Sequence, residues 1–448
     1  MKAITQYLQQ RGFTCAQDDY YSAIALWQKW YKGKVPAVHN YTQYNGKKHL
    51  RRCRKTLGMA KTVSEDWANL LLNERVAIAV QKQKAQQQIM KVLDNNHFWI
   101  RGNQLIELSF ALGTGAFVEF LDGDQVKIDY IRAGMIYPLA WDNGRITECA
   151  FASERTKDKI KTVTLNIHRM EGGQYIIENH VFERNGATMR EQELPEGVEP
   201  EVRTGSAVPR FQVITPNIAN NIDPDSPLGI SVYANALDQL ESTDLVFDSY
   251  YNEYRLGKKR ITVPLSLARI DMENDGTVTP TFDDNDTEFY AIPQEQGMDN
   301  KIQEHNMTIR AEDHSRGIQD MLNLVSWKCG FGTRRYIFQN GQVKTATEVI
   351  SNDSDLYRNM CKHELMLTGA LTGLVNAVAD ILKLGPQEVT VRYDDSIIVD
   401  SDRERETDRR DVQDGLMQPY EYRMKWYGED EKTAKEKTPE PASLTFKE

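Results

Sequence analysis

The stretch that decides the fold runs from Ala311 to Leu384 and reads AEDHSRGIQDMLNLVSWKCGFGTRRYIFQNGQVKTATEVISNDSDLYRNMCKHELMLTGALTGLVNAVADILKL. Its first part, residues 312–328, has apolar residues at helical spacing and is followed by two glycines, which predicts a helix that ends there. The next residues, 331–344, mix basic side chains, aromatics, amides and a glycine. The pattern therefore predicts a helix, a loop and then a second helix.

The second helix is expected to be unusually long. Thr345 and Glu348 have the spacing of a capping box, and no proline follows until Pro386. About forty residues at 1.5 Å each would make roughly 60 Å of helix, which needs packing partners along its length. Residues 365–384 are apolar almost all round. We therefore expect this half to be buried, within the chain or between copies of it.

Length and charge limit the possible functions. A chain of 448 residues exceeds the usual size of one hydrophobic core, so two to four domains are expected. The formal net charge is −10. A protein that wraps duplex DNA by neutralising its phosphates is normally basic. Any contact with nucleic acid should therefore be local or weak.

Cysteine usage and hydropathy predict a cytosolic protein without a membrane partner. The five cysteines are scattered and form no CxxC pair, which indicates neither a disulfide framework nor a zinc site and suits a reducing compartment. The first residues lack the apolar core of a signal peptide. The most apolar run, 367–382, is too short for a bilayer span and contains Asn376 and Asp380.

The rest of the sequence predicts an α+β protein. Helical patterns dominate the first 113 residues, whereas short alternating runs within 115–214 predict an antiparallel meander. A helix is expected at 229–256, strands at 260–292 and 388–399, and two short helices beyond residue 401.

Two groups of charged residues are candidate functional surfaces. After the turn predicted at Asn45-Gly46, six cations fall within nine residues: Lys47, Lys48, Arg51, Arg52, Arg54 and Lys55. On the helix expected at 229–256, four carboxylates recur at steps of three and four and form an acidic strip: Asp238, Glu241, Asp244 and Asp248.

Catalytic motifs are not found in the sequence. It contains no Walker A sequence, no GxSxG elbow and no HExxH helix. Asp394, Asp395 and Asp400 could be read as a metal-dependent nuclease site, but adjacent aspartates at strand ends are usually turn residues. We therefore predict neither an enzyme nor a bound metal or cofactor.

Four stretches carry a resemblance to a known family: YYSAIALWQKWYKG from residue 20, YNGKKHLRRCRKTLGMAKTVSEDWANLLLNE from residue 44, SPLGISVYANALDQLESTDLVFDSYYNEY from residue 226 and KTATEVISNDSDLYRNMCKHE from residue 344. Through them the chain resembles the portal proteins of tailed bacteriophages, in the branch found in siphophages and prophages of Gram-positive bacteria. The resemblance extends from about residue 20 to about residue 425.

The resemblance implies a ring-forming subunit with a wing, a stem, a clip and a crown, together with a tunnel loop and a tail. Carried onto this sequence, they are a wing (1–225), a first stem helix (226–257), a clip (258–308), a second stem helix (309–329), a tunnel loop (330–344), a long wing helix with a returning strand (345–400), a crown (401–437) and a flexible tail (438–448). Portal proteins form dodecameric rings at the special vertex of the capsid, through which DNA is packaged and ejected.

The implied partners are further copies of the chain, double-stranded DNA in the channel, the large terminase subunit, the major capsid protein and a head-completion or adaptor protein. The implied location is the virion, with assembly in the host cytoplasm. Two other classes stay open: the nuclease described above, and another minor capsid or scaffold component.

Specific residues acquire candidate roles from the resemblance, each with a plainer alternative. In the tunnel loop, DNA phosphates could be contacted by Arg334, Arg335, Gln339, Asn340 and Lys344; alternatively, the arginines bridge neighbouring loops. The acidic strip could line the channel and repel phosphate, or be a solvated face or a partner for cations of the next subunit. The basic cluster could bind DNA or the capsid interior, or form a salt-bridged subunit face. Trp27, Trp30 and Trp67 are expected in the core or an interface.

Overall fold

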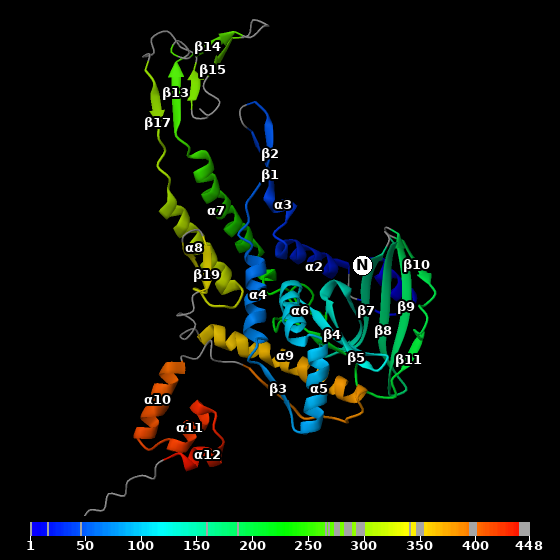
Figure 1. Ribbon diagram of the computed structural model, residues 1–448. Coiled ribbons are helices and arrows are strands. Elements are labelled where there is room, and N and C mark those ends of the chain that lie inside the picture. Colours follow the sequence, from blue (N-terminus) through cyan, green and yellow to red (C-terminus); the bar gives the residue numbers. More distant parts are fainter. Residues whose placement is uncertain are drawn as a thin grey trace, which may run out of the picture.

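The computed structural model describes residues 2–15, 18–44, 47–157, 160–185, 188–264, 267, 269–272, 278–281, 289–292, 301–339, 342–345, 354–393 and 401–438. Its elements form a body of helices and sheets from which two extensions project (Figure 1). One extension contains the helices α7 (Leu237–Leu256) and α8 (Ala311–Lys328). The other contains three short helices: α10 (Ser401–Gln413), α11 (Pro419–Tyr427) and α12 (Glu431–Glu436). The α+β class expected from the sequence is confirmed.

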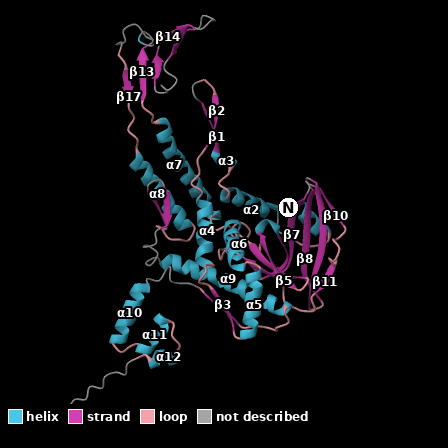
Figure 2. Ribbon diagram, viewed as in Figure 1, coloured by secondary structure: helices cyan, strands magenta, loops and turns pink. Residues whose placement is uncertain are grey.

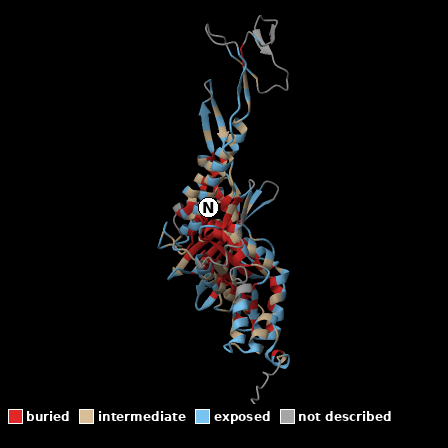
Figure 3. Cartoon of the chain, turned by 90° about the vertical axis from the view of Figure 1, so that its left-hand side faces the viewer, coloured by how far each residue is buried: buried red, intermediate tan, exposed pale blue. Residues whose placement is uncertain are grey.

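Helices and strands occupy different parts of the body (Figure 2). The helical part contains α2 (Asp18–Tyr31), α4 (Met59–Leu71), α5 (Gln83–Asn95) and α6 (Phe98–Leu112), which pack on one another. Trp27, Trp30 and Trp67 are all buried there, so their predicted place in the core is confirmed. Figure 3 shows that buried residues concentrate in the centre of the body, whereas both extensions are mostly exposed.

Two antiparallel sheets make up the strand-rich part. In the larger sheet, β10 (Thr188–Gln192), β9 (Gln174–Asn185), β8 (Ile160–Glu171), β7 (Arg145–Lys157) and β6 (Ile136–Asp142) are neighbours in that order, and β11 (Glu201–Arg203) also pairs with β9. In the smaller sheet the order is β12 (Phe211–Ile214), β4 (Gly115–Asp122) and β5 (Gln125–Arg132). The 3-10 turn η1 (Ala133–Met135) joins β5 to β6. The predicted meander is therefore confirmed.

The long helix α9 (Ser354–Ile381) packs on β12, β4, α4 and α5. Most of its second half is buried as expected, with Leu371, Leu374 and Val375 fully covered, whereas Leu365 and Met366 are exposed. α9 is also the one helix among the described residues whose length and hydropathy would suit a membrane span, but this buried face instead packs inside the protein.

The predicted start of this helix falls outside the described residues. Thr345 lies in β19 (Gln342–Thr345), where its backbone pairs with Tyr336 of β18 (Tyr336–Gln339), and α9 is described from Ser354 onward. Glu348 lies outside the described residues.

The helix expected at 229–256 starts later than its pattern suggests. The pattern predicts a helix from residue 229, but α7 begins at Leu237 after the 3-10 turn η2 (Ala234–Ala236). Gly229 N–H donates to Thr114 Oγ1 at 3.1 Å, and Val232 N–H donates to Phe110 O at 2.9 Å. Because these amides bond across to the end of α6, they are not available for helical bonds.

The remaining strands are short. Beyond α7, β13 (Arg260–Pro264) pairs in parallel with β16 (Phe289–Ile292) and antiparallel with β17 (Gln303–His305), next to a hairpin of β14 (Arg269–Met272) and β15 (Val278–Thr281). After α9, β20 (Val389–Arg392) returns to the body and pairs with β3 (Ala77–Val80).

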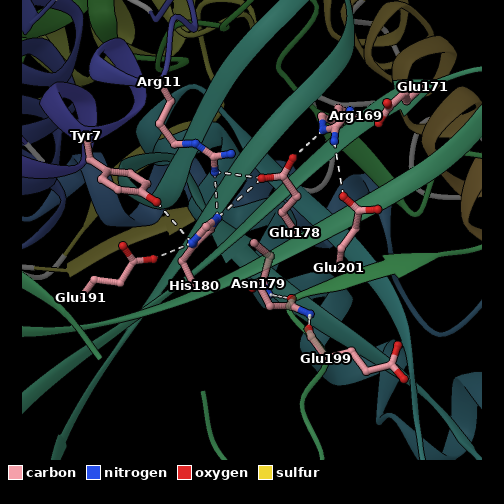
Figure 4. Close-up of polar contacts among 11 residues, drawn as sticks. Tyr7, Arg11, Arg169, Glu171, Glu178, Asn179, His180, Glu191, Glu199 and Glu201 are labelled. Carbon is pink, nitrogen blue, oxygen red and sulfur yellow. Dashed lines mark hydrogen bonds and ion pairs between the residues drawn. The ribbon is translucent and has the colours of Figure 1, made fainter. Parts of the chain in front are cut away.

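The N-terminal helix α1 (Lys2–Gln10) is attached to the larger sheet by a polar network (Figure 4). Arg11, just beyond the helix, forms an ion pair with Glu178 of β9 at 2.8 Å, and Arg169 of β8 bonds the same carboxylate. His180 lies between Tyr7 and Glu191, at 3.2 and 2.8 Å. Ile4 and Leu8 of α1 are buried beneath these contacts.

Candidate functional site

The acidic strip on α7 is divided between two environments. Asp238 and Glu241 are exposed, whereas Asp244 and Asp248 are 4% and 6% exposed. The four carboxylates share one side of α7, but Asp244 and Asp248 lie further along the helix than the first pair. There the segment before α4 covers them, so only the first part of the acidic strip is exposed.

Asp244 is the centre of that covered face. Its Oδ1 accepts hydrogen bonds from the Leu57 backbone N–H at 2.8 Å and from the Thr56 hydroxyl at 3.0 Å, and its Oδ2 lies 3.0 Å from His39 Nε2. Burial raises the pKa of Asp244, and the three hydrogen bonds oppose that rise. One turn further along α7, Asp248 Oδ1 accepts the Lys55 N–H at 2.9 Å. The two aspartates therefore hold the chain between His39 and Leu57.

That chain carries the basic cluster. α3 (Pro36–His39) leads into β1 (Asn40–Tyr44), which pairs with β2 (His49–Cys53), and we name the segment from Asn40 to Lys55 the basic hairpin. It projects beside α7, away from the body (Figure 1). At its base, Arg54 N–H donates to His39 O at 2.8 Å, and the Arg54 guanidinium donates to Val38 O at 2.8 Å. The hairpin is thus fixed where it leaves the body.

Most cations of the basic hairpin are accessible. Lys47, Lys48, Arg51 and Lys55 are exposed, and Arg52 and Arg54 are half-buried. The Lys55 ammonium lies 5.1 Å from the centre of the Tyr251 ring, a cation–π contact with α7. The structure therefore brings together the basic cluster and half of the acidic strip, which sequence reasoning treated as separate features.

In the predicted tunnel loop, the two arginines have different environments. Arg334 is exposed, as is Gln339. Arg335 is 9% exposed; its Nε lies 3.6 Å from Asp66 Oδ2 of α4, and its guanidinium lies over the Phe331 ring. Burial raises the pKa of Asp66, whereas the Arg335 charge favours the ionised form. Arg335 is therefore an internal partner of α4, and its contact with DNA stays a prediction.

The start of this loop is packed into the body. Trp67 of α4 stacks on Phe331 with ring centres 4.6 Å apart, and its indole N–H donates to Cys329 O at 3.0 Å. Within the loop, β18 lies on α8 because Gln319 bonds both the Tyr336 carbonyl and the Phe338 N–H, at 2.8 and 2.9 Å. The loop is therefore a hairpin attached to α8.

The other predicted loop contacts are only partly defined. Lys344 belongs to β19 and its backbone pairs with Ile337, but its side chain is not among those that the structure describes. Asn340 lies outside the described residues. The same holds for Asp394, Asp395 and Asp400, the alternative nuclease triad. In the part of the chain that the structure describes, no group of three or more His, Cys, Asp or Glu side chains could hold a metal ion.

The α7–α8 pair is joined near its outer end by a charged contact. Glu253 of α7 accepts two hydrogen bonds from the Arg310 guanidinium, at 3.0 and 2.9 Å, and lies 3.4 Å from His314. These bonds lower the pKa of Glu253 to about 2. The C-terminal half of α7 and the N-terminal half of α8 therefore lie side by side.

The chain is similar to one known family over nearly its whole length. Residues 15–437 match the family model described as phage portal protein, SPP1 Gp6-like. A solved structure titled "Neck of empty GTA particle computed with C6 symmetry" is similar, with 11% identity, a TM-score of 0.42, and 92% of this chain and 94% of that chain covered. No curated protein matches the sequence.

Proposed function

The chain belongs to the SPP1 Gp6-like family of phage portal proteins, and from this premise we propose that it closes into a dodecameric ring that conducts double-stranded DNA. Portal proteins are structural components of the phage head vertex, not enzymes. The observation that carries the proposal is the family match over residues 15–437, which includes both stem helices and the hairpin between α8 and α9.

In the ring we assign the wing to residues 1–225 with 345–400, the stem to 226–257 and 309–329, the clip to 258–308, the tunnel loop to 330–344, and the crown to 401–437. The α7–α8 pair, which extends from the body and carries a separate strand group at its outer end, supports this division. The clip would dock the large terminase subunit during packaging and head-completion proteins afterwards, and the wing would contact the major capsid protein.

The channel would adhere weakly to DNA because of its charge. A dodecamer would carry roughly −120, twelve times −10, and negative charge around a channel repels phosphate. With Asp244 and Asp248 buried, the carboxylates of the strip that can face the channel are Asp238 and Glu241. In the loop, Arg334 and Gln339 are the exposed candidates for phosphate contacts.

We further propose that the ring assembles in the host cytoplasm before it joins the capsid. The four stretches that carry the sequence resemblance support a place in the branch of siphophages and prophages of Gram-positive bacteria.

The test is the mass of the purified full chain, measured by native mass spectrometry, together with particle images viewed end-on. A closed ring with a central opening is expected. A chain that stays a single compact particle at every concentration, even with the capsid protein present, would overturn the proposal. A minor capsid or scaffold component need not close with twelve-fold symmetry, so the images also separate that alternative.

A further inference from the structure

The basic hairpin has the features of an element completed by another molecule. A two-stranded hairpin alone in water is marginally stable. Apart from the neighbouring α3, β1 and β2 pack mainly on each other, and their residues are exposed or half-buried. In the part of the chain that the structure describes, β1 and β2 form a sheet of two strands, so each has an unpaired edge. Unpaired edges readily bind a partner unless they are protected.

The direction of the hairpin is nevertheless fixed. Asp244 and Asp248 hold its base through backbone and side-chain hydrogen bonds, and Lys55 lies on Tyr251. A flexible tether for nucleic acid would not need three contacts with a helix. A rigid projection that presents cations at a set position is instead suited to a partner of defined shape.

The position of the hairpin indicates which surface of a second copy it would meet. It leaves α7 at Asp248 and runs along the half of α7 that ends at Leu256 (Figure 1). The same half of α7 packs on the N-terminal half of α8, through Glu253 and Tyr250. In a ring, copies stand at equal height, so the hairpin of one copy lies level with the N-terminal half of α8 in the next.

An exposed face of α8 at that height is complementary to the hairpin. Asp313, Arg316, Asp320, Leu324 and Trp327 recur at steps of three and four, and all are exposed. The first part of this face is acidic, with Glu312 beside it and one arginine within it. The second part is apolar, with Leu324 and Trp327 at 43% and 55% exposure. The carboxylates of Asp313 and Asp320, at the height of the hairpin, are complementary in charge to its cations.

We propose that the basic hairpin of one copy docks on this face of α8 in a second copy. The inference rests on the proposed ring and identifies one of its contacts. Arg51 and its neighbours would meet the carboxylates of Asp313 and Asp320. The contact is head-to-tail, because the two surfaces differ and lie on different parts of each chain, as closure of a ring requires.

Charge reversal tests the contact. We use the full chain with Arg51→Glu, Asp320→Arg or both, and Arg145→Glu, at the exposed turn between β6 and β7, as a matched control. Each single reversal places like charges together, which costs enough to weaken association about tenfold or more. Sedimentation at low and high salt would therefore show ring formation shifted to higher protein concentration for each single variant. The double variant should recover most of the loss, and R145E should behave as the wild type.

The results distinguish a hairpin that joins two copies from a hairpin that faces DNA. Rings from R51E and D320R that form as the wild-type rings do would overturn the hairpin contact alone. If R51E forms normal rings that no longer retain duplex DNA, the hairpin contact is also overturned, because the hairpin then faces nucleic acid. A wild-type chain that never associates overturns both the ring and this contact. Far-UV circular dichroism confirms folding, and recovery in the double variant cannot arise from misfolding.

Discussion

Glu119 should make the stability of this protein depend on pH above the ordinary range of a carboxylic acid. It lies in β4 with no exposed surface, and among the described residues neither of its carboxylate oxygens has a hydrogen-bond partner. Burial raises the pKa of Glu119 from 4.5 to about 8, although the nearby Arg210 charge opposes the rise. Glu119 is therefore protonated in the folded chain at neutral pH.

The sign and size of the effect follow from proton linkage. Below pH 4.5 the group is protonated in both the folded and the unfolded chain, so it imposes no penalty. Between pH 4.5 and about 8 only the folded chain keeps the proton, so the free energy of unfolding falls as pH rises. Each pH unit is worth about 1.4 kcal/mol, so the loss reaches at most about 5 kcal/mol and stays level at higher pH.

Glu119→Gln removes this penalty because glutamine has nearly the same shape and does not ionise. Urea unfolding, followed by tryptophan fluorescence at one protein concentration from pH 5 to pH 9, measures the difference between the variant and the wild type. The variant should gain stability progressively with pH, by several kcal/mol at pH 8 (about 5 at most). Asp122→Asn, at the exposed end of the same strand, is the control and should show no such trend. Parallel curves for Glu119→Gln and the wild type across this range would refute the reasoning.

Three further predictions concern buried contacts around α4, the end of α6 and α7. Asp244→Ala leaves the Leu57 N–H and its neighbours without their acceptor. It should lower the free energy of unfolding by about 3 kcal/mol and speed hydrogen exchange at the hairpin base. The control Asp238→Ala, at an exposed position, should change the free energy of unfolding by less than about 0.5 kcal/mol. Arg335→Met leaves Asp66 buried without its cation, so the free energy of unfolding measured by chemical denaturation should fall by about 3–5 kcal/mol. Adding Asp66→Leu should restore most of that stability. A double variant no more stable than Arg335→Met would mean that the two residues are not coupled. Gly113→Ala places a Cβ 2.3 Å from the Gly229 carbonyl oxygen, at a position where the backbone φ is 87°. The midpoint of thermal unfolding should therefore fall by several degrees. An unchanged midpoint would contradict this packing.

Much of the fold was predictable because its signals are local. The helix expected at 312–328 is α8 with one residue added at its start, and the alternating runs of 115–214 are paired strands. Turn residues mark these hairpins, as at Asn143 and Gly144, which both have positive φ between β6 and β7. The error at α7 lies where tertiary contacts decide, because the backbone of residues 229–232 bonds to the end of α6.

The site residues were less predictable than the helices and strands. Periodicity correctly placed four carboxylates on α7, but it could not show that Asp244 binds a segment nearly 190 residues earlier in the chain. Arg334 and Arg335 are adjacent and chemically identical, yet only Arg335 is buried, because Asp66 and Phe331 surround it. A spacing pattern shows which residues share a face of a helix. What covers that face depends on contacts distant in sequence.

The faces of α7 link the proposed channel wall to the proposed subunit contact. The first part of α7 presents Asp238 and Glu241 to solvent, the part after it holds the basic hairpin through Asp244 and Asp248, and another face of the helix packs on α8. Because both aspartates bond to the backbone of the hairpin base, any rotation or tilt of α7 moves the hairpin with it. A ring that changes the tilt of its stem helices must therefore also move the hairpin against the neighbouring α8. For this reason, a substitution that loosens the hairpin base should alter ring assembly even though it touches neither DNA nor a second copy.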